Sequence, residues 1–206
     1  MSEGPLIHVV DDDESFRTAV ERLLEAAGFE AVGHASTGDF LLNPPPDRPG
    51  CILLDIRMPG PSGLDLQAAL KRLGVTLPVV FLTGYADVAS TLQAMKAGAV
   101  DLLAKPVDRE KLLDALGRAL ARDAQHRKVH DEAKWLRARF ASLTPREREV
   151  FDLIVAGKLN KQIADELGIG ERTVKTERAH VLVKLGVGSA AELGRFAERL
   201  VRMTSE

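Results

Sequence analysis

Residues 51–55 form a short apolar run that ends in a carboxylate, Asp55, and a segment rich in Pro and Gly follows at 59–63. A continuous apolar run bounded by turn residues is typical of a strand that is buried on both faces, as in a parallel sheet. Open α/β sheets bind their ligands outside the carboxyl ends of such strands. Asp55 is therefore predicted to lie at a ligand site.

Strand-like and helix-like patterns alternate along the first 122 residues. Apolar segments predict strands, and amphipathic segments that end at or near glycine predict helices between them. The strands are expected at 6–10, 30–35, 51–55, 78–83 and 100–104, and the helices at 14–27, 37–42, 64–73, 86–97 and from 108 onward. This order predicts an α/β domain of the flavodoxin-like (βα)5 type, with a parallel sheet in the order 2-1-3-4-5.

Polar residues follow four of these predicted strands. Asp11 and Asp12 come after the first strand and Asp55 ends the third, while Thr83 and Lys105 end the fourth and fifth. Because the carboxyl ends of parallel strands share one edge, these side chains are expected to converge on one crevice. Three carboxylates at such close range repel one another, and Mg²⁺, which prefers oxygen ligands, would relieve that repulsion.

The same residues fit phosphoryl transfer to a carboxylate. Asp55 is predicted to attack phosphorus in line, with Mg²⁺ and Lys105 balancing the equatorial oxygens and the Thr83 hydroxyl donating to one of them. The product would be an aspartyl phosphate that acts as a covalent switch. Taken singly, the acidic residues 11–13 are equally explained as a helix start, and Lys105-Pro106 as a turn. The combination favours the phosphoryl site.

The first part of the chain resembles the receiver domain of two-component response regulators. The matching segments lie within residues 6–122 and are 9–14, 53–59 with Gly63, 82–84, 97–101 and Lys105-Pro106. The resemblance implies that Asp55 is the phosphoacceptor. It also implies that Asp12, Asp55 and the backbone carbonyl of Arg57 bind Mg²⁺ directly, with Asp11 nearby or acting through water. A cis Lys105–Pro106 peptide bond is expected on the same grounds.

Leu102 and Tyr85 are two further residues close to the predicted site in the sequence. Receiver domains usually carry Tyr or Phe three residues before the final lysine, and this chain has Leu102 there. An aromatic ring that swings inward on phosphorylation is therefore not available at that position. Tyr85, two residues after Thr83, is either a loop residue that partly covers the site or a residue that tunes water access and phosphoryl lifetime.

Residues 123–141 are expected to form a helical linker, because the chain has no Pro or Gly from 119 to 139 and is rich in charge and alanine. A thin apolar stripe runs along this segment, and Trp135 sits beside it. The stripe consists of Val129, Ala133, Leu136 and Phe140. It either packs onto a neighbouring domain of the same chain or forms a coiled-coil-like dimer contact.

The last part of the chain, residues 142–206, is expected to be an all-α domain of four helices. Thr144 and Glu147 fit a capping box with Pro145 at the first helical position. Helices predicted at 160–167 and 172–185 are joined by a short turn that contains two glycines, which indicates a helix-turn-helix. A fourth helix is predicted at 189–203.

Charge differs between the two parts. The first 122 residues carry 17 acidic and 12 basic side chains, a net charge of −5, whereas the remainder carries 13 acidic and 16 basic ones, a net charge of +3. The second part is therefore better suited to approach a polyanion such as DNA. A single cysteine, Cys51, excludes an internal disulfide framework and fits the reducing cytoplasm. No apolar run approaches the ~20 residues that span a bilayer, so no membrane association is expected.

This second domain resembles the LuxR/FixJ-type helix-turn-helix, and nearly the whole chain resembles a FixJ-subfamily response regulator. The matching segments are 143–150, 160–164, 172–175 and 184–187. The resemblance implies that Lys175, Thr176 and Ala179 face the base edges of double-stranded DNA. The candidates for phosphate contacts are Lys161, Thr173, Arg178 and Lys184.

Two residues depart from the LuxR-type pattern. Glu177 stands where His is common; it either accepts a hydrogen bond from a cytosine amine or pairs with Arg178 or Lys161, and the ion pair is favoured. Gly170 replaces the common Ser N-cap, a loss of a few tenths of a kcal/mol.

Together these features predict a DNA-binding transcriptional regulator rather than an enzyme. A sensor histidine kinase would phosphorylate Asp55, and the active state would form a homodimer through its helix 4–strand 5–helix 5 face. RNA polymerase is a further candidate partner. One alternative is a regulator that works without phosphorylation and uses the receiver as a constitutive dimerisation module. A Mg²⁺-dependent phosphatase is disfavoured, because Arg57 stands where a second aspartate would be required.

Overall fold

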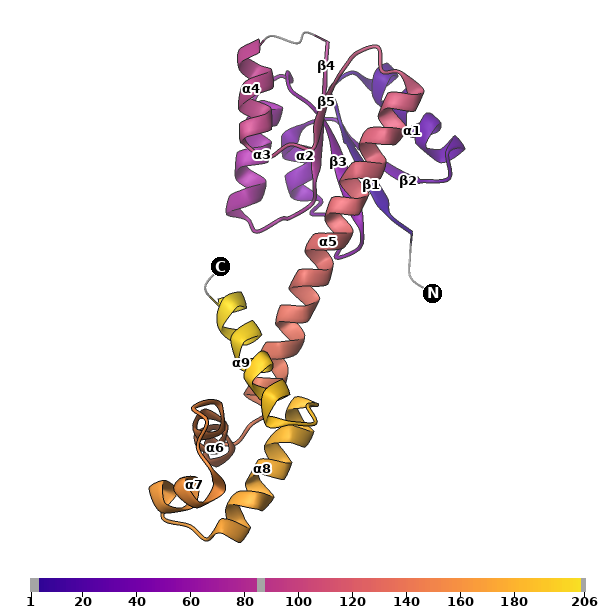
Figure 1. Cartoon of the computed structure of the whole chain (residues 1–206). Coiled ribbons are helices and arrows are strands. Elements are labelled where there is room, and N and C mark those ends of the chain that lie inside the picture. The colour runs from indigo at the N-terminus through magenta and orange to yellow at the C-terminus, as the bar shows by residue number, and fades with distance from the viewer. Residues whose placement is uncertain (1–3, 85–87, 205–206) are drawn as a thin grey trace. The chain divides into compact units, whose positions relative to one another are not determined.

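The computed structural model describes residues 4–84 and 88–204 (Figure 1). By its internal contacts the chain forms two compact units, Met1–Arg127 and Lys128–Glu206. Tyr85, for which a role in water access was considered, lies outside the described residues. Within the part that is described, no helix is long and apolar enough to cross a membrane.

The first unit alternates strands and helices along the described chain. The strands are β1 (Leu6–Val10), β2 (Glu30–His34), β3 (Gly50–Asp55), β4 (Val79–Thr83) and β5 (Asp101–Ala104), and the helices are α1 (Glu14–Ala26), α2 (Thr37–Leu42), α3 (Gly63–Arg72), α4 (Val88–Lys96) and α5 (Arg109–Ala141). All neighbouring strands pair in parallel, in the order β2-β1-β3-β4-β5. The predicted flavodoxin-like sheet is confirmed.

Helices cover both faces of this sheet (Figure 1). On one face α1 and the first turns of α5 pack against alternate residues of the strands, with Leu24 and Leu116 fully buried. On the other face α2, α3 and α4 enclose a second apolar cluster that includes Phe40 and Phe81. Every residue of β3 is buried, which explains why its sequence is a continuous apolar run.

Local hydrogen bonds fix the helix starts beside the carboxyl edge of the sheet. The Asp13 side chain caps α1 by accepting from the backbone N–H groups of Ser15 and Phe16, at 2.9 and 3.1 Å. A capping box between Ser62 and Asp65 starts α3 shortly after Asp55. The loops that follow β1 and β3 are therefore held at both ends.

A buried carboxylate binds α5 to the amino end of β3. Asp123 is 1% exposed, and its Oδ2 accepts from the Gly50 N–H at 3.1 Å and from Arg127 Nε at 3.0 Å. Arg127 Nη1 also donates to Asp47 Oδ1 at 2.8 Å. Residues 123–127, which the sequence pattern placed in a linker, thus contact the sheet of the first unit. The pKa of the neighbouring Cys51 thiol is raised to about 12 by burial and by Asp123, so this cysteine is a buried apolar residue.

The second unit consists of the end of α5 and of α6 (Pro145–Val155), α7 (Asn160–Leu167), α8 (Glu171–Leu185) and α9 (Ala190–Thr204). These helices share one apolar core, and the short turn between α7 and α8 confirms the predicted helix-turn-helix. The capping box of Thr144 and Glu147 at the start of α6 is present as predicted.

The apolar stripe at the end of α5 packs inside its own chain. Leu136 is fully buried, Ala133 is 7% exposed, and Phe140 packs against Phe151 with ring centroids 5.3 Å apart. Trp135 lies 6.3 Å from Phe196 between ring centroids. The alternative that this stripe forms a coiled-coil dimer contact is therefore wrong for Leu136, because the helix-turn-helix unit already covers it.

Candidate functional site

The carboxyl edge of the sheet holds two buried aspartates and one lysine in direct contact. Lys105 Nζ lies 2.6 Å from Asp11 Oδ2 and 2.7 Å from Asp55 Oδ2. Asp11 follows β1, Asp55 ends β3 and Lys105 follows β5, so residues up to 94 positions apart meet. Asp11 is fully buried and Asp55 is 6% exposed. These three residues therefore meet at one edge of the sheet, as the sequence pattern predicted.

Three carboxylates form an acidic pocket at this edge. One oxygen each of Asp11, Asp12 and Asp55 lies within 4.8 Å of the others, and Asp12 is exposed to solvent. Burial raises the pKa of Asp11 above its ordinary value, although the hydrogen bond from Lys105 works in the opposite direction. One ammonium cannot balance three carboxylates. The pocket therefore has the charge and the hard oxygen donors typical of a Mg²⁺ site.

The backbone after Asp55 turns back over the carboxylate. The Arg57 N–H donates to Asp55 Oδ1 at 3.1 Å, and the Gly63 N–H donates to the Ile56 carbonyl at 3.0 Å. A Cβ at Gly63 would stand 2.1 Å from the Asp55 carbonyl oxygen, so only glycine fits this close approach. The segment 55–63 is thereby folded against the site, and Arg57 has its backbone beside the carboxylate.

Thr83 and Leu102 lie on the neighbouring strands. Thr83 is 1% exposed, and its carbonyl accepts from the Lys105 N–H at 2.8 Å, which aligns the ends of β4 and β5. Leu102 is partly buried against the cluster beneath α2, α3 and α4. An aliphatic side chain thus fills the position that is usually aromatic. The Lys105–Pro106 peptide bond is cis, as the resemblance implied.

The side chain of Phe16, near the start of α1, contacts Lys105, and the sequence pattern gave no prediction of this contact. Lys105 Nζ lies 4.3 Å from the Phe16 ring centroid, a cation–π contact. Burial opposes the lysine charge, but the hydrogen bonds to Asp11 and Asp55 outweigh it and raise the pKa of Lys105. Arg17 Nη1, from the next residue, donates to the Asp11 carbonyl at 2.6 Å. The first turn of α1 therefore supports both the acid and the lysine.

In the second unit, α8 has a buried stripe and an opposite exposed face. Val174, Val181 and Leu185 are fully buried. Helical periodicity puts the predicted base-reading residues on the other side, and Lys175, Thr176 and Ala179 are all exposed. Thr173 at the start of α8 and Lys161 on α7 are exposed as well.

Two of the predicted phosphate-binding residues make contacts inside the unit. Lys184 Nζ pairs with Glu147 Oε2 at 2.7 Å, and this hydrogen bond lowers the pKa of Glu147. The Lys184 ammonium also lies 3.4 Å from the Ser142 carbonyl oxygen. Arg178 Nη1 donates to Asn160 Oδ1 at 3.3 Å and so links α8 to α7.

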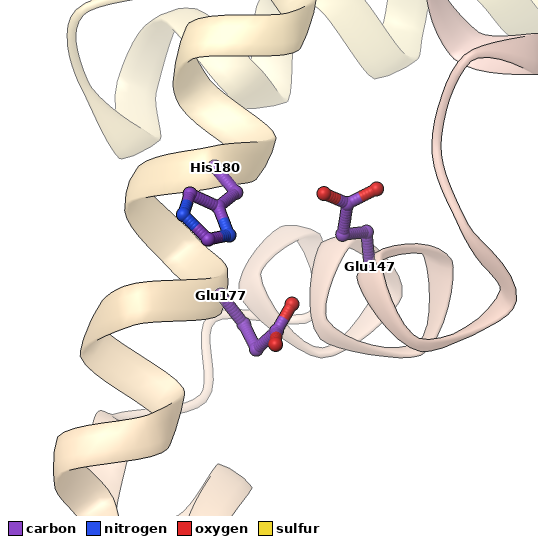
Figure 2. A group of neighbouring side chains, drawn as sticks. All are labelled: Glu147, Glu177 and His180. Carbon is purple, nitrogen blue, oxygen red and sulfur yellow. The ribbon is translucent and has the colours of Figure 1, made fainter.

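Glu177 lies against α6 rather than on the exposed face of α8. Figure 2 shows Glu177 and His180 of α8 together with Glu147 of α6, and one ligand atom of each lies within 4.8 Å of the others. Among the described residues Glu177 forms no ion pair, so the predicted pairing with Arg178 or Lys161 is wrong. Positions 177, 180 and 184 form one stripe that faces α6, and the adjacent Arg178 points to α7 instead.

These two units define a class of protein. A parallel (βα)5 sheet with an acidic pocket and a lysine at its carboxyl edge, followed by a helix-turn-helix, is the construction of a DNA-binding regulator with a phospho-accepting domain. Two family descriptions match the chain, the response regulator receiver domain over residues 7–117 and the luxR family of bacterial regulatory proteins over 141–197.

Similar proteins cover nearly the full length. Nodulation protein W of Bradyrhizobium diazoefficiens is 42% identical over 97% of this chain and 88% of its own. The transcriptional regulatory protein FixJ of Azorhizobium caulinodans is 41% identical over 96% of this chain and 93% of its own. The solved structure of the response regulator StyR matches with a TM-score of 0.89 and 42% identity over 96% of this chain and all of that one.

The chain belongs to the two-component response regulators with a LuxR-type DNA-binding domain, and it is a FixJ-like transcriptional regulator. This family consists of transcription factors and not of enzymes. The receiver domain implies a sensor kinase as a partner, and the LuxR-type domain implies DNA binding.

Proposed function

We propose that Asp55 accepts a phosphoryl group from a sensor histidine kinase and that the phosphorylated state binds DNA as a homodimer. The observation that carries this proposal is the single ammonium of Lys105 held between Asp11 and Asp55, both buried. In the transfer, an Asp55 carboxylate oxygen attacks phosphorus, the phosphorus–nitrogen bond of the phosphohistidine breaks, and the imidazole of the kinase leaves.

Each residue of the site has a part in this step. Lys105 moves from its ion pairs toward a phosphoryl oxygen as negative charge builds there, and the Thr83 hydroxyl donates to another oxygen. The Arg57 N–H holds Asp55 Oδ1 at 3.1 Å and so orients the carboxylate. Asp11, Asp12, Asp55 and the Arg57 carbonyl would hold Mg²⁺. When bound, the ion neutralises charge on the carboxylates and on the incoming phosphoryl group.

The exposed face of α8 is assigned to the major groove. Lys175, Thr176 and Ala179 would meet base edges, since lysine donates to guanine acceptors and a small side chain admits close approach. Thr173, Lys161 and Arg178 would contact phosphates. For Lys184 we assign a structural part in place of a phosphate contact, because its ammonium is already paired with Glu147.

Dimerisation is assigned to the α4–β5–α5 face of the receiver. Leu92 and Met95 on α4 are 54% and 44% exposed, which leaves apolar area for a partner. A dimer places two recognition helices on half-sites roughly one helical turn of DNA apart. RNA polymerase is the further partner that a transcriptional regulator would contact.

A second candidate is a regulator whose receiver dimerises without phosphorylation. Leu102 favours it, because a partly buried aliphatic residue cannot report phosphorylation as a swinging aromatic ring would. The two candidates predict different effects of a phosphoryl mimic on the molecular mass of the protein in solution. The first predicts an increase from monomer to dimer, and the second predicts no change.

The test uses beryllofluoride with Mg²⁺ as a phosphoryl mimic on the full-length protein, with multi-angle light scattering and affinity for a duplex selected from random sequences. The proposal expects a monomer-to-dimer shift and about tenfold tighter DNA binding, an effect within the usual range of allosteric coupling. Asp55→Asn should abolish both changes, and Asp131→Asn, at an exposed position of α5, should keep them. A dimer of unchanged mass and affinity in every sample would support the second candidate.

A further inference from the structure

A cavity of about 260 Å³ lies in the first unit at the amino end of β4, on the edge of the sheet opposite Asp55. Its apolar lining comes from the end of α3, the loop that enters β4 and β4 itself, and includes Leu70, Val75 and Leu77. Known ligand pockets begin at roughly 300 Å³, so this one suits a small molecule. It is separate from the acidic pocket and shares no residue with it.

Two cations, Lys71 and Arg122, stand at the rim of the cavity. Lys71 of α3, Arg122 and His126 of α5 line it, and its described lining includes no Asp or Glu. A Cβ at Gly98 would lie 3.9 Å from both Lys71 Nζ and Arg122 Nη2, so the two cations flank the same backbone. Arg122 Nη1 donates to the Gly98 carbonyl at 3.1 Å, but neither side chain has an ion-pair partner among the described residues, and like charges at close range repel. An anion between them would relieve this repulsion.

The wall of the cavity contains an unsatisfied polar group. Gln67 is 4% exposed, and its Oε1 is buried without a hydrogen-bond partner. Buried amide oxygens in folded proteins nearly always have a partner, so this one calls for a donor. Gln67 and Lys71 are four residues apart on α3, so they lie on the same side of the helix, about 6 Å apart along its axis.

We propose that this cavity binds a small carboxylate with an apolar body and a hydroxyl donor at its other end. The carboxylate would lie between Lys71 and Arg122, the apolar body against Leu70 and Val75, and the hydroxyl toward the Gln67 amide, which would rotate to bring its buried oxygen to the cavity surface. Such a ligand ties α5 to the loops before β4 and β5. Binding there gives the receiver a chemical input that is independent of Asp55.

The probe for the test is 4-hydroxybenzoate, a rigid ring that carries a carboxylate at one end and a hydroxyl donor at the other. Calorimetric titration of the unphosphorylated full-length protein should give saturable binding. Benzoate lacks the hydroxyl and phenol lacks the carboxylate, and both should bind more weakly. Amide chemical shifts of Gly74 and Gly98, which line the cavity, should move with the titration.

Matched variants test whether binding of the probe depends on the cavity or only on the overall charge of the protein. Lys71→Gln with Arg122→Gln should weaken 4-hydroxybenzoate about tenfold or more, as expected for the loss of charge-assisted hydrogen bonds. Arg72→Gln with Lys96→Gln removes the same charges outside the cavity and should change affinity less than about twofold. Gln67→Met should erase the preference over benzoate. Thermal melting of each variant checks that it folds.

Two outcomes would overturn the proposal. One is the absence of saturable heat and of shifts at Gly74 and Gly98 at millimolar probe concentrations. The other is equal affinity in the Lys71/Arg122 variant and the Arg72/Lys96 variant, which would place any binding elsewhere on the chain.

Discussion

The ring of Phe16 and the ammonium of Lys105 lie 4.3 Å apart while the same ammonium holds the two buried carboxylates. This contact places the first turn of α1 in the support of the phosphorylation site. The aromatic face stabilises the lysine charge without offering a competing anion.

Replacing Phe16 tests that role. Phe16→Leu should slow phosphorylation of Asp55 by acetyl phosphate by about three- to tenfold, because a partly buried cation–π contact contributes roughly 1 kcal/mol or more. Phe29→Leu is the matched control, since Phe29 packs partly buried against the same apolar cluster. The rate is followed by intact mass over time. Equal rates for the two variants would remove Phe16 from the site.

Two buried histidines, His8 of β1 and His34 of β2, contact each other. His8 Nδ1 and His34 Nε2 lie 3.1 Å apart, and both rings contact Phe40. Burial, with the nearby His34 charge, lowers the pKa of His8 from 6.5 to about 4. A lowered folded-state pKa means that the stability is complete above pH 6.5 and is lost as the pH falls toward 4. The free energy of unfolding should therefore fall by about 2 kcal/mol between pH 7 and pH 5.

Urea unfolding at the two pH values measures this difference. The double variant His8→Val with His34→Val should show a clearly smaller loss, because no buried imidazole then has to be charged. His130→Gln, an exposed histidine of α5, should keep the wild-type dependence. A double variant with an unchanged pH dependence would show that other groups cause the acid sensitivity.

The buried carboxylate of Asp123 should contribute to the stability of the receiver unit. Asp123→Ala leaves the Gly50 N–H and Arg127 Nε without their acceptor, and breaking such a buried interaction destabilises by about 2–4 kcal/mol. Asp131→Ala removes an exposed carboxylate from the same helix and should change stability by less than about 0.5 kcal/mol. Denaturant midpoints compare the two. A midpoint for Asp123→Ala equal to that of the control would contradict the role.

Substitutions of two lysines of α8 should have different effects, one on DNA binding and the other on thermal stability. Lys175→Ala should weaken binding to the selected duplex by about 1–3 kcal/mol and leave the melting temperature nearly unchanged, since its side chain is exposed. Lys184→Met should lower the melting temperature instead, because Glu147 is 4% exposed and loses its cation. The reverse pattern in the two assays would show that Lys184 faces DNA.

Much of this molecule follows from its sequence. The alternation of apolar runs and amphipathic segments predicted the sheet order, and the residues after its strands predicted the contact of Asp11, Asp55 and Lys105. The reason is that the periodicity of apolar residues is a local property of the sequence. The carboxyl ends of parallel strands must also share one edge of the sheet.

Contacts across elements could not be predicted in the same way. The Phe16 contact depends on how α1 rolls over the sheet, and the burial of Asp123 depends on where α5 crosses β3. Glu177 was misassigned because its charge suggested an ion pair with the next residue, whereas helical spacing aims it at α6 with His180 and Lys184. The spacing of positions 177, 180 and 184 places all three on one face of the helix, and this could have been predicted from the sequence.

Phosphorylation of Asp55 can be measured by intact-mass analysis after treatment of the protein with acetyl phosphate and Mg²⁺. We expect one added phosphoryl group on the wild type and on Asp131→Asn, none on Asp55→Asn, and a strongly reduced yield for Lys105→Met. Peptide mapping should place the group on Asp55. A phosphoryl group that forms equally on Asp55→Asn, or no phosphorylation of the wild type, would contradict the account.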